Sequence, residues 1–295
     1  MSRPNLPLLE VRRLTKRYLR PGGWLAPAAP ALLAVDDASF EIKHAQTLAL
    51  VGESGSGKTT LAKAVVRLVE PDSGSILFGG EDLLALGPRE MRLRRRDIQI
   101  IFQDPYASLN PRLKVTDIVS EPLENFDLGM SRPERRERVL ALLAKVGLQP
   151  DLALRYPHEL SGGQRQRVAI ARALAPQPKL IVCDEPVSAL DVTVQAQVIR
   201  LLMDLQAELG VAYLFVTHNL AVARQMSHRV AVMRQGRIVE TNDCDALFAQ
   251  PRHPYTRELL AASVIREGSG RAKLPRRAAG LAPDNAREVR GICEA

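Results

Sequence analysis

The feature that most constrains the fold is a glycine-rich segment with the sequence GESGSGKTT, residues 52–60. It follows the apolar residues 47–51, which predict a buried strand, and it precedes residues 61–68, which predict a helix. Glycines let the backbone curl until several N–H groups face one anion, and the helix N-terminus adds its dipole. A strand, a glycine-rich loop, Lys-Thr and a helix in this order predict a phosphate-binding loop in an α/β protein.

Each residue type in this loop has a chemical use. Lys58 is long enough to reach the β- and γ-phosphates of a nucleotide, and the hydroxyl of Thr59 can ligate Mg²⁺. The alternative is an ordinary Gly/Ser-rich turn between a strand and a helix, which the spacing and the flanking elements disfavour. The predicted nucleotide-binding residues are Gly52, Glu53, Ser54, Gly55, Ser56, Gly57, Lys58, Thr59 and Thr60.

An acidic pair, Asp184 and Glu185, follows a second apolar strand at residues 179–183. Asp184 suits a Mg²⁺ role, either directly or through water, and Glu185 would polarise the attacking water as general base. The alternative is an acidic pair that caps the next turn, helped by Pro186. Beside a phosphate loop, the catalytic interpretation is favoured.

A third motif begins at Ser161, which with Gln164 has the form of a capping box before a helix at residues 165–175. Helix capping alone is the structural alternative. However, Gly162 and Gly163 are poor helix formers, each costing about 1 kcal/mol relative to Ala. Glycines here predict that something approaches the backbone closely, and a helix N-terminus with a serine hydroxyl suits a γ-phosphate.

The rest of the chain alternates strands and helices, which predicts a mostly parallel sheet. The block from 115 to 175 is helical and interrupts this alternation, so we expect it to be an insertion. An amphipathic helix at 194–209 ends at Gly210, and a hairpin is expected around Gln235 and Gly236. After about Ile265 the chain is rich in Arg, Gly and Pro, and we expect a loosely ordered tail.

Together these motifs resemble the ATP-binding-cassette (ABC) transporter ATPases. Residues 156–167 match the family's signature, and 184–191 match its acidic strand end and dimer-contact loop. Thr217-His218 matches the switch histidine, and Gln103 matches the glutamine that senses magnesium and the membrane partner. The resemblance spans about 8–262 and implies a RecA-like P-loop NTPase core, an antiparallel β subdomain and an inserted α-helical signature subdomain at about 115–175. Residues 263–295 would form a flexible C-terminal tail.

The resemblance implies roles for single residues. Thr59, Gln103 and Asp184 would arrange Mg²⁺, Glu185 would activate water, and His218 would hold the γ-phosphate and that water in register. For His218 the alternative is a cap of the helix that starts near Asn219.

An aromatic residue near the first strand stacks on adenine in the family, and Tyr18 is the candidate here. The alternatives are that Tyr18 is an ordinary strand aromatic, or that Trp24 takes the adenine role.

Two cassettes of this family dimerise head to tail, so a second subunit would complete each site. The signature residues Ser161, Gly162, Gly163 and Gln164 would face the ATP of the partner subunit, and Asp191 would line the dimer contact. A monomer would then bind ATP but hydrolyse it poorly.

Four segments resemble the dipeptide/oligopeptide/nickel importer subfamily. They are residues 103–112, 191–198 and 253–260 and the long loop at 20–33. That subfamily implies a second, homologous ATPase as partner, with a heterodimer expected and a homodimer left open. It also implies two transmembrane permeases and an extracytoplasmic solute-binding protein, with this chain peripheral on the cytoplasmic face of the bacterial inner membrane. Many members carry a cysteine-containing C-terminal stretch, which in some is thought to hold an iron–sulfur cluster. Here only Cys293 lies in the tail, so no cluster is expected.

Composition argues against a membrane-spanning or secreted protein. No apolar run approaches the roughly 18 residues of a spanning helix, and residues 1–10 hold no signal-peptide core. Three widely spaced cysteines suggest a reducing compartment. The net charge of +8 is spread along the chain with few aromatics, so solvated faces beside a membrane explain it as well as a nucleic-acid groove does. Because the resemblance is to a transporter subunit, no nucleic-acid partner is expected.

Several cargoes and one further class stay open. Peptide import leads, and nickel, glutathione, antimicrobial peptides or another small solute are alternatives, because the specificity of such importers lies in other chains. ABC ATPases of DNA repair, chromosome organisation or translation form the non-transport alternative. Those carry coiled-coil insertions, zinc modules or a second cassette, and none is visible here.

Overall fold

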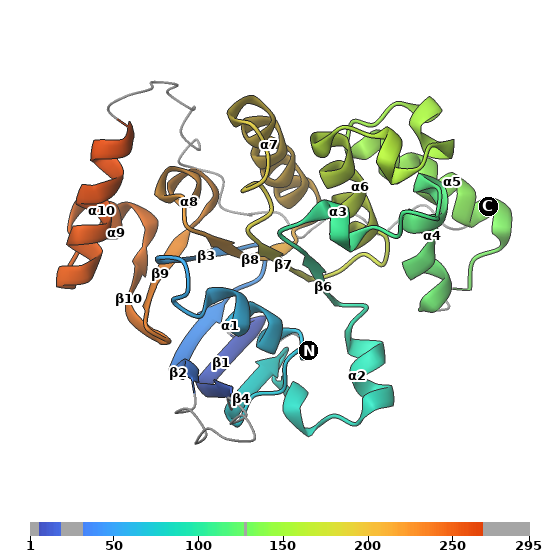
Figure 1. Ribbon diagram of the computed structural model, residues 1–295. Helices are drawn as coiled ribbons and strands as arrows, with labels where there is room; N and C mark the ends of the chain where they lie inside the picture. Colours follow the sequence, from blue (N-terminus) through green and yellow to red (C-terminus); the bar gives the residue numbers. More distant parts are fainter. Residues whose placement is uncertain (1–5, 19–31, 127–128, 268–295) are drawn as a thin grey trace, which may run out of the picture.

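The computed structural model describes residues 6–18, 32–126 and 129–267 (Figure 1). The strands are β1 (Leu9–Tyr18), β2 (Leu32–Ile42), β3 (Thr47–Val51), β4 (Ser73–Phe78), β5 (Glu81–Asp82), β6 (Ile98–Ile101), β7 (Leu180–Asp184), β8 (Ala212–Thr217), β9 (Arg229–Arg234) and β10 (Arg237–Asp243). The α-helices are α1 (Lys58–Val65), α2 (Pro88–Arg94), α3 (Pro105–Ser108), α4 (Val115–Asn125), α5 (Arg132–Lys145), α6 (Gly162–Leu174), α7 (Val192–Leu209), α8 (Leu220–Met226), α9 (Cys244–Ala249) and α10 (Pro254–Glu267). Three 3₁₀ turns complete them: η1 (Leu83–Ala85), η2 (Pro150–Leu154) and η3 (Pro157–Glu159).

The strands form two sheets. The larger has the order β10-β9-β3-β8-β7-β6 and is parallel except for the β9–β10 hairpin. The smaller has the order β2-β1-β4-β5 and is antiparallel. Figure 1 shows α3 to α6 gathered at one end of the larger sheet, beside β6. The expected parallel core, antiparallel sheet and helical insertion are therefore all present.

The central strands β3, β7 and β8 are buried at every position. Strands covered on both faces read as continuous apolar runs, which is why the sequence shows them so clearly. Alternate residues of β7 and β8 serve different cores, because successive side chains of a strand point to opposite faces. Cys183 and Phe215 pack with the helical block, whereas Val182 and Leu214 pack with α1 and the antiparallel sheet.

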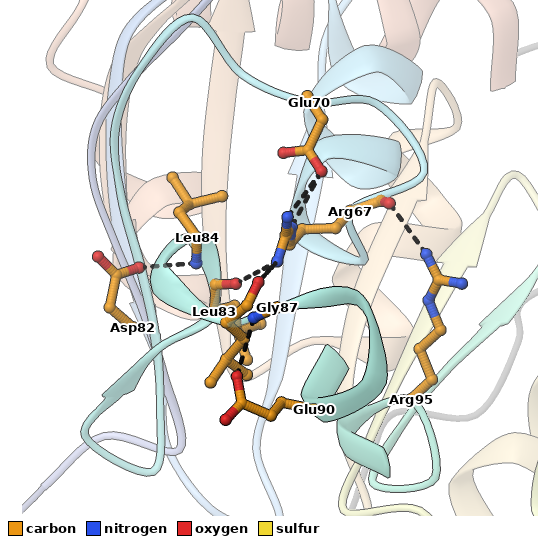
Figure 2. Close-up of polar contacts among 9 residues, drawn as sticks. Arg67, Glu70, Asp82, Leu83, Leu84, Gly87, Glu90 and Arg95 are labelled. Atoms are coloured by element: carbon orange, nitrogen blue, oxygen red, sulfur yellow. Dashed lines mark hydrogen bonds and ion pairs between the residues drawn. The ribbon is translucent and has the colours of Figure 1, made fainter. Parts of the chain in front are cut away.

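Arg67, two residues after the C-terminal end of α1, connects that end of the helix to neighbouring elements (Figure 2). Its guanidinium donates to the carbonyl oxygens of Leu83 (2.7 Å) and Leu86 (2.8 Å) and to the Glu70 carboxylate (2.8 Å). The Arg67 carbonyl in turn accepts from the Arg95 guanidinium at 3.1 Å. The helix that begins with the phosphate-loop lysine is thus tied at its other end to η1 and to the residue that follows α2.

Several element boundaries differ from expectation, and the helix expected at 61–68 runs over Lys58–Val65. The helix after the signature begins at Gly162, three residues earlier than predicted, so both glycines lie in its first turn. The second strand of the hairpin, expected over 237–240, continues to Asp243, because its pairing with β9 extends to the Asp243–Arg229 pair.

Part of the tail prediction falls within the structure. α10 continues to Glu267, past Ile265. Most of the predicted tail, including Cys293, and most of the predicted loop at 20–33, including Trp24, lie outside the described residues. Within the described ranges, no helix is long and apolar enough to span a membrane.

Candidate active site

The phosphate loop connects β3 to α1 and is enclosed by other strands. Gly52 and Gly57 have φ angles of 154° and 103°. A Cβ at Gly57 would lie 2.1 Å from the Ala34 carbonyl oxygen, and one at Gly52 would lie 2.2 Å from the Met233 carbonyl oxygen. Glycine is required at both positions, since no larger residue fits between β2 and β9. Ser54 and Gly55 are exposed on the loop.

Lys58 folds back over the loop that precedes it. Its Nζ donates to the carbonyl oxygens of Gly52 at 2.9 Å and Glu53 at 2.7 Å, and to Ser56 Oγ at 3.4 Å. Burial lowers the pKa of Lys58, and the nearby Glu185, Asp184 and Glu53 carboxylates oppose that shift. The ammonium is therefore held by backbone oxygens at the position from which a phosphate would be bound.

Thr59 and Asp184 form a pair of oxygen ligands. The Thr59 hydroxyl donates to Asp184 Oδ1 at 2.9 Å. Burial raises the pKa of Asp184, and the hydrogen bond from Thr59 opposes that shift. A hydroxyl and a carboxylate are hard donors that fit Mg²⁺, which keeps several waters and binds substrate phosphates. The described residues contain no group of three or more His, Cys, Asp or Glu side chains that could form an all-protein cage.

Glu185 lies at the centre of three strand ends. Its carboxylate accepts from Gln103 Nε2 at 3.1 Å and lies 3.2 Å from His218 Nδ1. Gln103, Glu185 and His218 follow β6, β7 and β8, and parallel strands place their carboxyl ends at one edge of the sheet. Glu185 has a φ of 48°, and its N–H donates to the Val216 carbonyl at 3.1 Å. Backbone strain of this kind concentrates at functional sites.

The alternative role for His218 as a helix cap is wrong. Asn219 caps α8, since its Oδ1 accepts from the N–H groups of Ala221 at 2.9 Å and Val222 at 3.3 Å. His218 is left half-exposed beside Glu185, with 54 % of its side chain accessible. A polar contact of His218 with the reacting water stays a prediction.

The signature residues form the predicted capping box at the start of α6. Ser161 Oγ accepts from the Gln164 N–H at 3.3 Å, and Gln164 Oε1 accepts from the Ser161 N–H at 2.9 Å. A Cβ on Gly163 would lie 2.5 Å from Val194 Cγ1 on α7, whereas one on Gly162 would lie 3.4 Å from Leu190 Cδ2. The close approach expected at these glycines therefore has an internal cause at Gly163, which the sequence alone did not show.

These two glycines give a matched stability prediction. Gly163→Ala should lower the free energy of unfolding by about 1–3 kcal/mol, since the new methyl group overlaps Val194. Gly162→Ala meets only an ordinary contact and should gain up to about 1 kcal/mol of helix propensity. Urea unfolding of both variants checks this. Equal stability of the two would show that α6 and α7 do not pack as described.

Asp191 has a role inside the chain that the sequence analysis missed. Its carboxylate caps α7, accepting from the Val194 N–H at 2.9 Å. An aspartate directly before an amphipathic helix is itself a capping signal, and it could have been found. The predicted dimer contact of Asp191 remains a prediction.

Tyr18 lies at the end of β1 and is 38 % exposed. It pairs in register with Leu32 of β2, two residues before Ala34, whose carbonyl meets Gly57. Its strand pair therefore borders the phosphate loop. Stacking of Tyr18 on adenine stays a prediction, and its rival Trp24 lies outside the described residues.

The chain is similar to several known proteins. The family model for ABC transporters matches residues 35–188. A probable peptide ABC transporter ATP-binding protein of Sinorhizobium fredii, y4tS, is 54 % identical over 258 residues, which cover 88 % of this chain and 73 % of that protein. The glutathione import ATP-binding protein GsiA of Escherichia coli is 51 % identical over 263 residues, 89 % of this chain. The match spans only 42 % of GsiA.

Solved structures show the same fold. A dimeric, post-hydrolysis state of the ATP-binding cassette MJ0796 bound to ADP and Pi has a TM-score of 0.71 and 33 % identity, covering 80 % of this chain and 98 % of that one. CbiO1 from Clostridium perfringens, part of the ABC transporter complex cbiONQ, has a TM-score of 0.71 and 28 % identity, covering 89 % of this chain and 94 % of that one. A RecA-like ABC ATPase fold is thereby confirmed.

Proposed function

The chain belongs to the ABC transporter family, and we propose that it is the ATP-binding, ATP-hydrolysing subunit of an importer for di- or oligopeptides. One observation carries the enzymatic part of this proposal. Lys58, the Thr59–Asp184 pair and the Gln103–Glu185–His218 cluster converge at the carboxyl ends of neighbouring strands. The groups to which we assign phosphate binding, metal binding and water activation thus lie at one edge of the sheet.

In the proposed hydrolysis of ATP, each step is assigned to side chains or N–H groups of this chain. The N–H groups of residues 52–60 and the Lys58 ammonium bind the phosphates of ATP. Thr59, Asp184 and Gln103 would hold Mg²⁺, which would supply neutralising charge on the phosphate oxygens. Glu185 accepts a proton from the attacking water, and His218 orients that water against the γ-phosphate.

A head-to-tail dimer would complete each site. Ser161 and Gly162 are exposed at the N-terminus of a 13-residue helix, where unpaired N–H groups favour an anion. Ser161, Gly162, Gly163 and Gln164 would then contact the ATP of the partner subunit. The related MJ0796 cassette is itself dimeric in a post-hydrolysis state bound to ADP and Pi, which supports a dimer here. Asp191, which caps α7 in its own subunit, would lie at the dimer contact.

The dimer gives a second prediction. ATP turnover per subunit should rise with protein concentration and level off, since a monomer lacks the signature residues opposite its ATP. Steady-state ATP hydrolysis, measured alongside light scattering across a dilution series, checks this. Full turnover by a demonstrably monomeric sample would refute the two-subunit site.

The cargo is proposed from the relatives' names. Peptide import is favoured by the 54 % identity to the Sinorhizobium protein, and glutathione, itself a tripeptide, is a second candidate at 51 %. The proposed partners are a second, homologous ATPase, two transmembrane permeases and an extracytoplasmic solute-binding protein, at the cytoplasmic face of the inner membrane. Co-purifying the assembled complex and screening dipeptides, oligopeptides and glutathione for stimulated ATP hydrolysis would test it. Stimulation by nickel alone would overturn the peptide assignment.

A further inference from the structure

The phosphate loop is contacted by a residue from the other end of the chain. Tyr255 lies in the first turn of α10, and its hydroxyl oxygen accepts from the Glu53 N–H at 3.3 Å, across 202 residues of sequence. Tyr255 is only 3 % exposed. Figure 1 shows α10 beside α9, near β10 at the edge of the larger sheet. None of the proposed steps of ATP hydrolysis accounts for this contact.

The Glu53 N–H and the Gly52 carbonyl belong to one planar peptide group and point in opposite directions. The carbonyl of this group accepts from Lys58 Nζ at 2.9 Å, while the N–H donates to Tyr255. The group is therefore held by Tyr255 on one side and by Lys58 on the other. Rotation of the peptide plane would weaken both hydrogen bonds, and each bond polarises the other.

We propose that Tyr255 is a positioning residue of the ATP site, which fixes the Gly52–Glu53 peptide group and thereby the Lys58 ammonium. This inference rests on the proposed function only in that Lys58 binds the phosphates of ATP. It makes α10 part of the support of the phosphate loop.

Tyr255 is itself oriented from neighbouring elements. The Arg234 guanidinium, at the end of β9, lies 4.6 Å from the centroid of the Tyr255 ring. The Tyr255 N–H donates to His253 Nδ1 at 3.1 Å. The Glu240 carboxylate of β10 accepts from the N–H groups of Arg252 and His253, each at 2.9 Å. The hydroxyl is thus aimed at the loop by contacts from β9, from β10 and from the start of α10.

A purely structural role for Tyr255 makes a different prediction. The ring packs in a core cluster with residues of α8 and α9, including Leu220 and Leu247. Phenylalanine would preserve that packing and the stacking of Arg234, and it would remove only the oxygen that accepts from Glu53. The effect of Tyr255→Phe on ATP binding therefore separates positioning from packing.

The first test is calorimetric titration of the full chain with ATP and Mg²⁺. Tyr255→Phe should raise the Kd for ATP about three- to tenfold, the effect of one lost neutral hydrogen bond. The matched control is Tyr213→Phe, which removes a buried hydroxyl that donates to the Leu202 carbonyl at 3.1 Å on another part of the fold. It should bind ATP as the parent does, although urea unfolding shows a loss of stability.

Lys58→Ala in the same titration distinguishes failure of the positioning role of Tyr255 from failure of the proposed ATP site. Loss of binding in that variant with parent-like binding in Tyr255→Phe overturns the positioning role alone. Parent-like binding in Lys58→Ala would instead overturn the ATP site itself.

Amide hydrogen exchange supplies an independent measurement that begins with the parent chain. In the parent chain the Glu53 N–H should exchange more slowly than that of the exposed neighbour Ser54, since Tyr255 protects it. Tyr255→Phe should remove the difference. Exchange of Glu53 as fast as Ser54 in the parent would overturn the proposal.

Discussion

Glu185→Gln should reduce ATP hydrolysis by about 10²- to 10⁴-fold, the usual contribution of a general base, while ATP binding stays close to that of the parent. The glutamine amide has the size of the carboxylate. It can therefore still contact Gln103 Nε2 and His218 Nδ1, which lie 3.1 Å and 3.2 Å from the Glu185 carboxylate. It cannot accept the proton of the attacking water. The closed, ATP-bound dimer should therefore accumulate.

Steady-state phosphate release, together with size-exclusion chromatography in ATP, checks this result. Glu208→Gln is a matched control, because it makes the same chemical change in an exposed carboxylate that pairs with Lys145. That variant should hydrolyse ATP at the parent rate. If Glu185→Gln also does so, another group accepts the proton, and the role assigned to Glu185 is wrong.

Lys58→Ala should weaken ATP binding by about 10- to 150-fold, the value of a lost hydrogen bond to a charged group. The ammonium is the cation that lies against the loop's own carbonyl oxygens, at 2.7 Å and 2.9 Å. Removing it also frees the loop backbone that it holds. Hydrolysis should fall with binding, since the phosphates are no longer held in position.

Titration with ATP measures this effect directly. Lys43→Ala removes an exposed lysine from the turn between β2 and β3 and should bind ATP as the parent does. An unchanged Kd in Lys58→Ala would contradict the phosphate-loop interpretation. Circular dichroism of both variants excludes a general loss of structure.

Much of this site could be predicted from the sequence, because its motifs are local. The loop from Gly52 to Thr60 lies between a strand and a helix, and the capping box of Ser161 and Gln164 lies within four residues. Spacing of this kind determines hydrogen bonds and helix starts without reference to the rest of the fold. The ends of the apolar strands likewise located Asp184 and Glu185.

Contacts between distant segments could not be predicted in this way. No local pattern indicates that Gly163 faces Val194, or that the Tyr255 hydroxyl reaches Glu53. These contacts depend on how helices pack and on which side chains converge, so they exist only when elements far apart in the chain are brought together. The capping role of Asp191 was different, since its signal was local and was overlooked.

The sequence by itself determined that the chain has a phosphate loop, an acidic strand end and a signature helix, since each is written within a few consecutive residues. Only the tertiary structure decided that Gln103, Glu185 and His218 meet at one carboxylate. The parallel sheet is the reason, because it places the ends of three separate strands at one edge. The same folding brings the hydroxyl of Tyr255 in α10 to the Glu53 N–H of the phosphate loop, a contact that no local pattern could have located.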